Sequence, residues 1–551
     1  MAQEHICLVL LFFGCKFVGK GSGVGLIVNT KQGNIKGNVN LTNNYVEYLG
    51  IPYAEFKGRF TPPGDAPVFK QTFEANRGDI SCKQYFLLAK TIIGQEDCLT
   101  LSVYRPIYVN ATRPLAVIAF IYGGGYYWGI SRDWVYNVKF LLRKNVIVVK
   151  INYRIGAFGF LCLRNEGAPG NVGLRDQIAA LKWIKNNIAA FGGDPNNITV
   201  FGESAGGVSV NILILTQQEK GLFKRAIIDS GPVSMPHLLT TTPIATAERV
   251  ARCMGYNGRN NSHDLLEFYL DATDDEIAKG SVRDQTNDVF TPYLFKLCVE
   301  DESCSKDPIL STTALDLLNN AKNIGKIDIL YGYNNKEGIM YASPFNRQGL
   351  RNLEKDFSKA IPNTYIFRDT RTKLNFYKDL KCFYFNNSTI NYTALVDYFS
   401  DSIVFYPSIV NMEAYLRNPN ITMYNYYFTY SSVRNVNKHL SNLFYFPGAN
   451  HADEIFYLFD PEMYKLSPAL RKDAIMIDIM TTLWTNFAKT GSSKVILRYL
   501  VLRHGVHNIS KIGRYYVPTY LHYDNTWSLS NFCAIIYSGF ARLYYACIIH
   551  L

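Results

Sequence analysis

Short, uninterrupted apolar runs constrain the fold of this chain more than any other feature of its sequence. The runs lie at residues 115–121, 146–151, 198–201, 226–228 and 327–331. They are rich in Ile and Val, and they lack the alternation of apolar and polar residues that marks a half-exposed strand. Strands of this kind are covered on both faces, as in a parallel sheet between two layers of helices. We therefore expect a large, mostly parallel central sheet flanked by helices, in the α/β class.

Helical patterns separate these runs. In one of them, apolar residues recur at spacings of three and four, at Leu174, Ile178, Leu181, Ile184 and Ile188. This spacing predicts a helix that lays one apolar face on the sheet, and the Gly-Gly-Asp-Pro turn at residues 192–195 ends it. An apolar face at residues 475–487 predicts another helix late in the chain. Residues 26–49 alternate between apolar positions and Gly or Asn turns, which predicts antiparallel strands leading into the sheet.

The chain of 551 residues shows no composition break that would separate two cores. Its polar segment at residues 256–288 has a less regular pattern and no Pro- or Ser-rich tether. We interpret it as excursions over the face that carries the functional site, not as a linker. One domain is therefore expected at residues 23–491. It follows an N-terminal segment at 1–22 and precedes a divergent C-terminal segment at 492–551.

The charge of the chain gives no sign of a nucleic-acid partner. The 57 Lys and Arg exceed the 45 Asp and Glu by 12. Between Lys494 and Leu551, six Lys and Arg stand against the single Asp524, so this stretch supplies five of the twelve. Runs of Lys and Arg with interleaved aromatic residues, which are typical of nucleic-acid binding, do not occur. With 48% apolar residues, the composition also excludes a disordered chain or a polytopic membrane protein.

The first residues predict entry into the secretory route. Residues 6–15 form an apolar run that matches the central part of a signal peptide and is too short to span a bilayer. No Lys or Arg precedes it and no clear Ala-x-Ala site follows, which leaves a buried N-terminal strand as the alternative. Asn-x-Ser/Thr sequons begin at Asn40, Asn110, Asn197, Asn260, Asn386, Asn387, Asn391, Asn420 and Asn508. Although some arise by chance in an Asn-rich chain, they favour a secreted or secretory-lumenal protein.

One motif points directly to chemistry. Gly202 to Gly206 fit the pattern Gly-x-Ser-x-Gly, in which a serine sits on a sharp turn between a strand and a helix. The run at residues 198–201 supplies the strand, and residues 208–215 read as the helix. Ser204 is therefore a candidate nucleophile.

A glycine run can supply the hydrogen-bond donors that a serine nucleophile needs. When the serine attacks a carbonyl group, negative charge forms on the carbonyl oxygen. Three glycines follow the strand expected at residues 115–121, and their bare N–H groups can turn toward a substrate oxygen. Gly124, Gly125 and the N–H of Ala205 would then form an oxyanion hole, although a glycine run alone is equally a flexible turn. The aromatic residues that follow, at 126–128, are candidates for an ester pocket or for core packing.

Ordered motifs extend along most of the chain. They lie at residues 96–101, 122–126, 152–156, 170–177, 191–195, 202–207 and 487–491. Together they resemble the type-B carboxylesterase/cholinesterase family of α/β-hydrolases, over about residues 25 to 491. Motifs in a fixed order are far more specific than any one of them. The resemblance implies the α/β-hydrolase fold and a serine carboxylesterase that hydrolyses small-molecule esters through an acyl-enzyme intermediate.

The resemblance also implies where the acid and the base of a catalytic triad lie. In this fold the acid and then the histidine follow the serine along the chain. Glu337 stands in an Asn-Lys-Glu-Gly stretch after the run at residues 327–331, and His451 precedes an acidic pair and an apolar helix. His439 lacks that context. Neutral His451 would take the proton of Ser204 while Glu337 holds its tautomer, with no metal or organic cofactor. Taken alone, Glu337 would be a solvated surface carboxylate and His451 a residue at a helix start.

The cysteines follow the family pattern only in part. The resemblance implies a disulfide between Cys82 and Cys98. The segment between them holds Tyr85 and Phe86 but no Trp, whereas cholinesterases place a choline-binding Trp there, so we do not expect a dedicated cholinesterase.

A second disulfide is harder to place from the sequence. Cys253 matches the start of the family's second disulfide, but residues 265–268, where its partner is expected, contain no Cys. Cys298 and Cys304 are the alternative partners. Eleven cysteines leave at least one unpaired.

Further alternatives concern the tail and the function. The resemblance implies a Trp-Pro stretch and a final strand that close the domain, and residues 492–551 show neither of them clearly. Arg542 interrupts the apolar run at residues 532–551, which disfavours a membrane anchor. The alternative function is a non-catalytic adhesion protein on the same fold, as in the neuroligins, but such proteins usually lose a triad residue. The acyl and alcohol specificity depends on loops between residues 231 and 300 that the sequence does not place.

Overall fold

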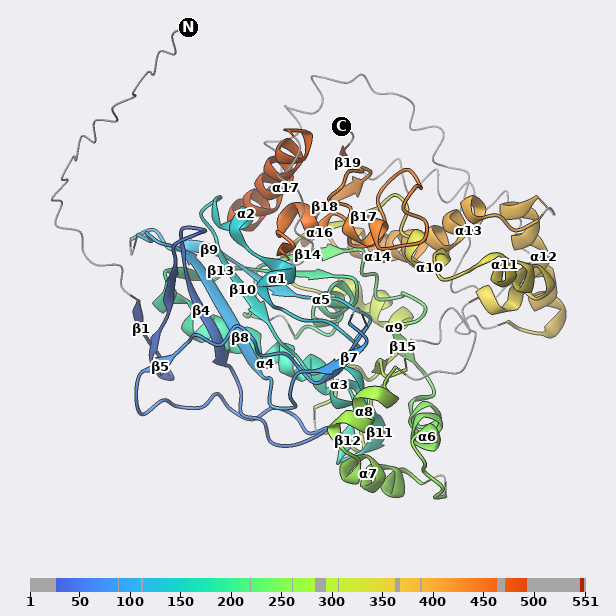
Figure 1. The fold of residues 1–551 in the computed structure, drawn as a ribbon, viewed down its shortest axis with the longest axis horizontal. Coiled ribbons are helices and arrows are strands. Elements are labelled where there is room, and N and C mark those ends of the chain that lie inside the picture. The colour runs from blue at the N-terminus through green and yellow to red at the C-terminus, as the bar shows by residue number, and fades with distance from the viewer. Residues whose placement is uncertain are drawn as a thin grey trace, which may run out of the picture.

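A ten-stranded mixed sheet forms the centre of the molecule (Figure 1). The computed structural model describes residues 26–492, apart from 88, 111, 219, 260, 283–293, 306, 362–366, 387–388 and 463–470, together with 546–549. From one edge to the other, the strands of the sheet are β19(Ala546–Ile549), β18(Ile421–Phe428), β17(Ile327–Asn334), β14(Arg225–Asp229), β13(Gly193–Glu203), β9(Leu115–Ile121), β10(Ile147–Ile151), β8(Thr100–Pro106), β4(Tyr45–Pro52) and β3(Asn38–Asn40).

The sheet is parallel from β10 to β19 and antiparallel from β10 to β3. The five apolar runs of the sequence all fall in the parallel part, in β9, β10, β13, β14 and β17. Val200 in the middle of β13 pairs with Ala119 on one side and Ala226 on the other, and all three are fully buried. The expected fold class is confirmed. The antiparallel strands expected at residues 26–49 are also present, since β1(Ile27–Thr30) pairs with β2(Gly33–Lys36), and β3 with β4.

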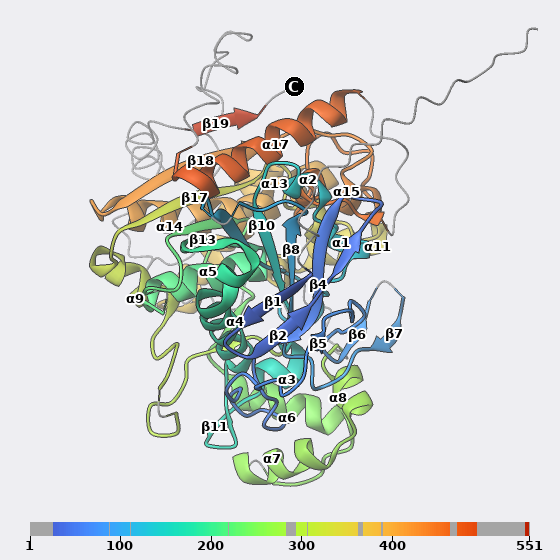
Figure 2. The same cartoon turned by 90° about the vertical axis from the view of Figure 1, so that its left-hand side faces the viewer.

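Helices cover both faces of the sheet. Helix α17(Arg471–Thr490) lies along one face, and α4(Val172–Asn187) and α5(Ala205–Leu215) lie along the other (Figure 2). Every residue of α5 is buried, as expected of a helix that is apolar on all sides. Both α5 and α4 pack against β13, and the carboxyl half of this strand is fully buried.

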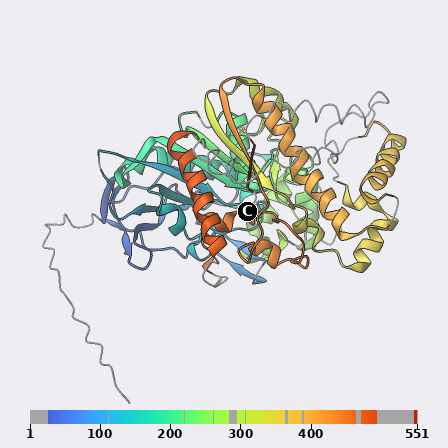
Figure 3. The same ribbon diagram turned by 90° about the horizontal axis from the view of Figure 1, so that it is seen from above.

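Further helices and strands surround this core. Seen from above, α12(Thr370–Phe385) and α13(Tyr392–Phe399) gather at the end of the molecule opposite to the N-terminal strands (Figure 3). The helices are α1(Asp133–Tyr136), α2(Lys139–Leu142), α3(Gly156–Phe160), α6(Pro243–Cys253), α9(Ala314–Asn319), α10(Ile339–Ala342), α11(Arg347–Lys355), α12(Thr370–Phe385), α13(Tyr392–Phe399), α14(Tyr406–Leu416), α15(Val436–His439) and α16(Ile455–Leu458). The minor strands are β5(Phe73–Glu74), β6(Gln84–Phe86), β7(Thr91–Ile93), β11(Cys162–Asn165), β12(Ala168–Pro169), β15(Leu239–Thr240) and β16(Leu297–Cys298).

The polar segment at residues 256–288 is more regular than its sequence pattern indicates. It holds two helices, α7(Ser262–Asp271) and α8(Asp274–Gly280). Thr273 and Glu276 form a capping box at the start of α8, so the polar residues that weakened the pattern satisfy the helix ends. The two helices pack on α6, β11 and α3.

The C-terminal segment adds a strand that the sequence did not indicate. Residues Ala546–Ile549 pair in parallel with Asn425–Phe428 at the edge of the sheet. Residues 492–551 show no clear final strand in the sequence, but the structure places one there, β19. The proposed signal run at residues 6–15 lies outside the described residues, and the anchor expected to be absent at 532–551 lies almost wholly outside them. Within the part that is described, no helix is both long and apolar enough to cross a membrane.

Two disulfides join distant parts of the chain. Cys82 and Cys98 are bonded, with their Cα atoms 5.0 Å apart. Cys298 is bonded to Cys162, which lies 136 residues earlier, so it is not the partner of Cys253. Cys253 is a free and exposed thiol at the end of α6, and Cys304 is also free. Neither of the two partners considered for Cys253 is bonded to it, since Cys298 is bonded to Cys162 and Cys304 is free.

A buried ion pair explains two of the sequence motifs. Nε of Arg154 lies 2.8 Å from one carboxylate oxygen of Asp176, and Nη2 lies 2.6 Å from the other. The backbone N–H of Arg154 also donates to this carboxylate at 3.1 Å. Both side chains are almost fully buried, and together they fix the loop after β10 to helix α4. A bidentate pair of this kind offsets the cost of removing two charges from water.

Candidate active site

A sharp turn holds Ser204 at the carboxyl end of β13. The backbone passes from the strand, which ends at Glu203, directly into α5, which begins at Ala205. Ser204 has φ 54° and ψ −123° there, a conformation that a residue other than glycine adopts only when its surroundings impose it. Its N–H donates to the carbonyl oxygen of Asp229 at 2.8 Å, which anchors the turn to β14.

Glycines allow the neighbouring backbone to approach this turn. A Cβ atom at Gly206 would lie 2.1 Å from the carbonyl oxygen of Ile121, and one at Gly123 would lie 2.8 Å from Cβ of Ser204. Either distance is too short for a real side chain. The glycines of the two sequence motifs therefore let β9 and the loop after it pack directly against the serine.

The order of the strands brings Glu337 and His451 to the same place. Strands β13, β14, β17 and β18 are parallel neighbours, so their carboxyl ends meet at one edge of the sheet. Ser204 follows β13, Glu337 follows β17, and His451 lies in the segment after β18. Residues that are 247 positions apart in the chain thereby become neighbours.

His451 bridges the other two side chains. Its Nε2 lies 2.8 Å from Oγ of Ser204, and its Nδ1 lies 2.5 Å from Oε2 of Glu337. An imidazole that donates Nδ1–H to the carboxylate keeps Nε2 as an acceptor for the serine proton. The exposed fractions of Ser204, His451 and Glu337 are 8%, 3% and 0%. The structure thus brings together a hydroxyl, a base and a group that orients the base.

The other carboxylate oxygen of Glu337 is also hydrogen-bonded. Its Oε1 accepts hydrogen bonds from the hydroxyl of Ser230 and from the backbone N–H of Asn334, each at 2.7 Å. These donors compensate for the loss of water around a fully buried carboxylate. The interpretation of Glu337 as a solvated surface residue is therefore wrong.

Buried carboxyl groups surround His451. Oε1 of Glu203 lies 3.4 Å from its Nε2. Burial raises the pKa of Glu203 to about 8, with the charge of His451 opposing the rise and the neighbouring carboxylates adding to it. Burial also raises the pKa of Asp229 to about 7 and that of Glu454, which faces Asp229, well above its ordinary value. Several acids at this site therefore hold their protons to an unusually high pH.

The same carboxyl groups set the basicity of His451. Burial acts to lower its pKa, but the carboxylate of Glu337, with smaller contributions from Glu203 and Glu454, raises it to about 9. The carboxylates stabilise the imidazolium that forms when His451 takes a proton. Strong shifts of this kind beside a cavity are typical of functional sites.

Two glycines of the loop after β9 line the same cavity as the serine. Gly124 and Gly125 have φ of 103° and 62°, and both line the cavity next to Ser204. A Cβ at Gly124 would lie 2.1 Å from the carbonyl oxygen of Trp128, so this turn requires a glycine. Ala205 is the first residue of α5, where an N–H group has no partner within its own helix. The three expected oxyanion-hole residues thus lie around the serine.

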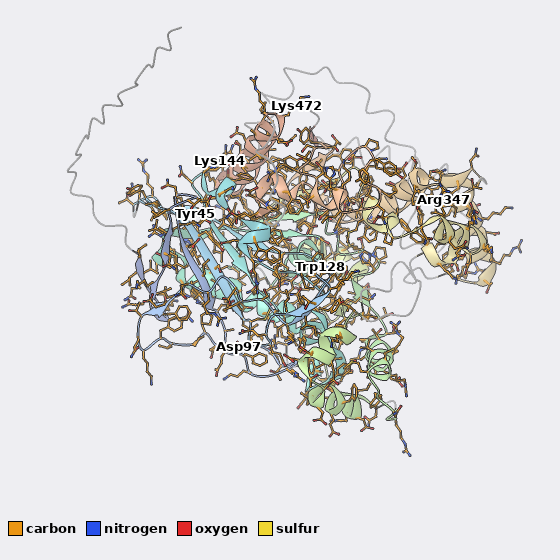
Figure 4. All side chains as sticks on the ribbon, in the orientation of Figure 1. Tyr45, Asp97, Trp128, Lys144, Arg347 and Lys472 are labelled. Atoms are coloured by element: carbon orange, nitrogen blue, oxygen red, sulfur yellow. A yellow bond between two sulfur atoms is a disulfide. The ribbon has the colours of Figure 1, made fainter. Side chains whose placement is uncertain are left out.

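A cavity of about 250 Å³ opens onto the serine. Phe86 and Trp128 lie in its wall, with their ring centroids 6.1 Å apart. Trp128 lies in the middle of the molecule, far from Arg347 at its outer end (Figure 4). Of the three aromatic candidates at residues 126–128, only Trp128 lines the cavity. Tyr126 is fully buried and its hydroxyl contacts Ser209 at 3.1 Å, so it is a core residue.

Sequence reasoning missed several residues around the serine. They are Glu203, Ser230, Asn334, His237 and Tyr341. Glu203 had a usable signal, since it is the middle residue between the first glycine and the serine of the motif. His237 and Tyr341 had none, because no sequence pattern shows which loop residues reach a cavity. Among the described residues, no group of His, Cys, Asp and Glu could hold a metal ion.

Comparisons with known proteins show the family of the chain. The carboxylesterase family model matches residues 25–507 of the chain. Esterase B1 from Culex pipiens is 32% identical over 331 residues, which cover 57% of this chain and 60% of that protein. Bile salt-activated lipase from Homo sapiens is 31% identical over 487 residues, which cover 84% of this chain and 61% of that protein. The chain therefore spans about three-fifths of the length of these two curated relatives.

A solved structure shows the same fold. Juvenile hormone esterase from Manduca sexta, with OTFP covalently attached, matches with a TM-score of 0.75 and 23% sequence identity. The match covers 85% of this chain and 91% of that chain. The arrangement of the sheet and its helices is accordingly that of an α/β-hydrolase. Because the family model covers most of its length, the chain belongs to the carboxylesterase family.

Proposed function

We propose that this protein is a serine carboxylesterase that hydrolyses small-molecule carboxylic esters through an acyl-enzyme intermediate. The observation that carries the proposal is the continuous hydrogen-bonded series of Ser204, His451 and Glu337. It supplies a nucleophile, a base and a group that orients the base, in the order that acyl transfer requires. The names of the two curated relatives, an esterase and a lipase, agree with this activity.

The first half of the reaction forms the acyl-enzyme. Oγ of Ser204 attacks the carbonyl carbon of the ester while Nε2 of His451 accepts the hydroxyl proton. Glu337 stabilises the imidazolium through Nδ1. As the ester C–O bond breaks, His451 gives this proton to the departing alkoxide oxygen. The alcohol leaves, and the acyl group remains on Ser204.

The second half releases the acid. A water molecule takes the place of the alcohol, His451 removes one of its protons, and the resulting oxygen nucleophile attacks the acyl carbon. The bond to Oγ breaks and His451 returns the proton to Ser204. Each step uses only these side chains, water and the ester.

The N–H groups of Gly124, Gly125 and Ala205 are the proposed oxyanion hole. Negative charge develops on the carbonyl oxygen in both halves of the reaction, and fixed donors stabilise it without reorganising. Each donor is expected to lower the barrier by about 3 kcal/mol. The positive φ values of the two glycines and the position of Ala205 at the start of α5 support the assignment.

The proposed substrates are small and uncharged. The cavity of about 250 Å³ is slightly smaller than the usual range for ligand sites. The segment between Cys82 and Cys98 contributes Phe86 to its wall. Glu203 is the carboxyl group among the described lining residues, and burial raises its pKa to about 8, which disfavours its ionised form near pH 7. The wall therefore offers little attraction to a cationic choline ester.

The adhesion-protein alternative receives no support. Such a protein usually lacks one residue of the triad. Here Ser204, His451 and Glu337 are all present, and His451 lies within hydrogen-bonding distance of the other two. The matching family and relatives are esterases and a lipase.

We also propose that the protein enters the secretory pathway. Two disulfides support this, since such bonds persist in oxidising compartments. The sequons at Asn110, Asn391 and Asn420 are exposed. The full chain is expressed in secretory cells, and its N-linked glycans are removed with an enzyme. The removal should shift the mobility of the protein on a gel. The shift should be smaller in a double variant with Asn391→Gln and Asn420→Gln. An unglycosylated, reduced protein in the cytosol would contradict the proposal.

Residues 492–551 are proposed to be dispensable for the chemistry, because every proposed catalytic residue precedes them. Their one described element is β19, whose removal uncovers the edge of β18. A chain that stops after Gly491 must therefore be assayed as soluble, monodisperse protein. A truncated protein that turns over esters more than tenfold more slowly per titrated site would contradict this assignment.

A fluorophosphonate probe tests the proposed activity most directly. The probe should form one adduct, at Ser204, and its uptake should parallel the loss of p-nitrophenyl ester hydrolysis. Ser204→Ala should abolish both. Ser209→Ala is the matched control, since Ser209 is a buried serine on the same helix whose hydroxyl donates to the carbonyl of Ala205. Labelling at another residue, or ester hydrolysis without labelling, would contradict the assignment.

A further inference from the structure

Glu337 and His451 lie in different segments, and hydrogen bonds besides their own join these segments. Glu337 follows β17, and His451 lies in the segment after β18, the parallel neighbour of β17. The backbone N–H of Lys336 donates to the carbonyl oxygen of Ala449 at 2.9 Å. The N–H of Ala449 in turn donates to Oδ1 of Asn335 at 2.8 Å. The two segments are therefore attached to each other directly beside the triad.

Asn450 joins the base itself to the other segment. Its Oδ1 accepts one hydrogen bond from the backbone N–H of His451 and another from that of Met340, each at 2.8 Å. Met340 lies in α10, shortly after Glu337 in the chain. The side chain is buried, since only 2% of Asn450 is exposed. One amide oxygen thus connects the backbone of the base to the helix that follows the acid.

The backbone of Asn450 is held as well. Its carbonyl oxygen accepts a hydrogen bond from Nδ2 of Asn334 at 2.8 Å, and the N–H of Asn334 donates to Oε1 of Glu337 at 2.7 Å. A series of contacts therefore runs from Glu337 through Asn334 to Asn450, and the next residue is His451. The hydrogen bond between His451 and Glu337 closes this ring. The ring fixes where the imidazole stands relative to the carboxylate.

The backbone beside His451 needs such anchors. Ala452 has φ 60°, in the left-handed region that residues with a Cβ atom rarely adopt. A conformation of this kind persists only where the surroundings impose it. The N–H of Asn450 also donates to Oδ2 of Asp453 at 2.7 Å, which ties the turn together across Ala452. Without the side-chain oxygen of Asn450, this segment can relax and carry the imidazole away from Ser204.

We propose that Asn450 is a positioning residue, whose amide oxygen holds the backbone of His451 so that Nε2 faces Ser204 and Nδ1 faces Glu337. This role rests on the proposed function and adds to it a residue outside the triad and the oxyanion hole. Asn450 takes no proton and forms no bond in the reaction. It acts through His451, whose Nε2 must stay within hydrogen-bonding distance of Oγ. A displacement of about 1 Å in a reacting group can slow the chemistry by roughly a hundredfold.

Two substitutions of similar shape test the oxygen apart from the bulk of the side chain. Asn450→Leu keeps a branched side chain but removes the acceptor, whereas Asn450→Asp keeps an oxygen in the same place. With a p-nitrophenyl ester, kcat per site titrated with the fluorophosphonate should fall about tenfold or more in Asn450→Leu. The ratio kcat/KM should fall equally, because the contact acts on the chemical step. On its own pH plateau, Asn450→Asp should recover kcat to within about threefold of the unaltered protein.

Asn418→Leu is the matched control. Asn418 is 1% exposed and is not part of the cavity wall. Its Nδ2 donates to the carbonyl oxygens of Ala321 and Ile324, and its Oδ1 accepts the N–H of Asn420, all at 2.9 Å. This substitution removes a comparable set of buried hydrogen bonds, so it should lower Tm but leave kcat per titrated site unchanged. A loss of turnover in Asn450→Leu alone then reports on position and not on stability.

The proton between His451 and Glu337 gives a readout that needs no substrate. Nδ1 of His451 lies 2.5 Å from Oε2 of Glu337, and a proton in so short a hydrogen bond gives a low-field resonance in NMR spectra. The resonance should be present in the unaltered protein, in Asn418→Leu and in Asn450→Asp. It should move or disappear in Asn450→Leu.

The outcomes separate the role of Asn450 from the activity itself. The role would be overturned by an Asn450→Leu protein that keeps kcat within about threefold, or by an Asn450→Asp protein as slow as Asn450→Leu. If Asn450→Leu does not fold, Asn450→Ala replaces it, because it removes the same oxygen and adds no bulk. An unaltered protein that neither hydrolyses esters nor takes up the fluorophosphonate would contradict the proposed function instead. The resonance then decides on Asn450 alone, and an unchanged resonance in Asn450→Leu would show that the amide oxygen does not position the ring.

Discussion

Oε1 of Glu203 lies 3.4 Å from Nε2 of His451, the same ring nitrogen that lies 2.8 Å from Oγ of Ser204. One imidazole nitrogen therefore faces both the proposed nucleophile and a buried acid. The negative charge of Glu203 raises the pKa of His451, since it favours the imidazolium that faces it.

We expect kcat/KM to rise with pH as His451 becomes neutral, with the acidic limb near pH 9 and above the ordinary histidine range. Glu203→Gln removes a negative charge beside Nε2, so the imidazole should lose its proton more easily and the limb should move to lower pH. Rates for one p-nitrophenyl ester between about pH 6 and 10 would locate the acidic limb in the unaltered protein and in Glu203→Gln. The same midpoint in the two proteins would show that Glu203 does not act on His451.

Stability should change with pH in the opposite direction. Burial raises the pKa of Glu203 to about 8 and the pKa values of Asp229 and Asp453 to about 7. The carboxylate of Glu337 raises the pKa of His451 to about 9, against the effect of burial. In each case the folded protein holds a proton to a higher pH than the unfolded chain does. The stability that this contributes is present at low pH and is lost as the pH rises through the raised values.

We therefore expect Tm to fall between about pH 5 and 9, as followed by differential scanning fluorimetry. Glu203→Gln should flatten the decline, because the amide does not titrate. A Tm that rises over this range would show that these groups do not dominate the pH dependence of stability.

Glu337→Gln tests the orientation of the base. The amide cannot accept Nδ1–H of His451 as a carboxylate does, so the imidazole loses its preferred tautomer and the stabilisation of its cation. A fall in kcat of about 10⁴-fold is expected. Ser230→Ala removes one of the donors to Glu337 and should cost far less. Active-site titration separates the loss of turnover from the loss of folded protein. More than a tenth of the original activity in Glu337→Gln would contradict the role.

Asp176→Asn should destabilise the fold without touching the serine. It leaves the almost fully buried guanidinium of Arg154 without its counter-charge, which costs about 3–5 kcal/mol of the free energy of unfolding. Asp79→Asn breaks an exposed pair with Arg77 and serves as the control, with no measurable change expected. Urea unfolding of the two variants decides the matter, and equal stabilities would mean that the buried pair is not a structural requirement.

The cysteines should divide into bonded and free groups. Alkylation of the native, unreduced protein should label Cys253 and Cys382, which are exposed thiols. Peptide mapping without reduction should link Cys82 to Cys98 and Cys162 to Cys298. Cys253→Ser should leave the map and the ester turnover unchanged. A linked peptide that contains Cys253 would show that the pairing differs.

The sequence predicts the core of this fold because burial on both faces leaves a local signal. The run at residues 115–121 coincides with β9. Strand β13 is longer than its run, since it starts at Gly193 and its register shifts before Ile198. Its first residues are polar and partly exposed, so hydrophobicity does not mark them. Helices α7 and α8 escape notice for a related reason, because they are short and rich in polar caps.

The site divides in a similar way. Ser204 and the glycines lie in compact motifs, so their local pattern is enough to find them. Glu337 and His451 are single residues in separate segments, and only the resemblance to the family identifies them. Their meeting depends on strand order, which a local pattern does not encode. The bond between Cys162 and Cys298 spans 136 residues and poses the same difficulty.

The separation of Ser204 and His451 by 247 residues has a consequence for biosynthesis. At a synthesis rate of about 5–20 residues per second, the histidine emerges roughly 10–50 s after the serine. During that interval the hydroxyl has no base and is no more reactive than a serine in any unfolded peptide. The proposed ester cleavage can begin only when β18 has joined the sheet and the loop that follows it has brought His451 to Ser204. The nascent chain therefore has no complete triad until almost the whole domain has been made.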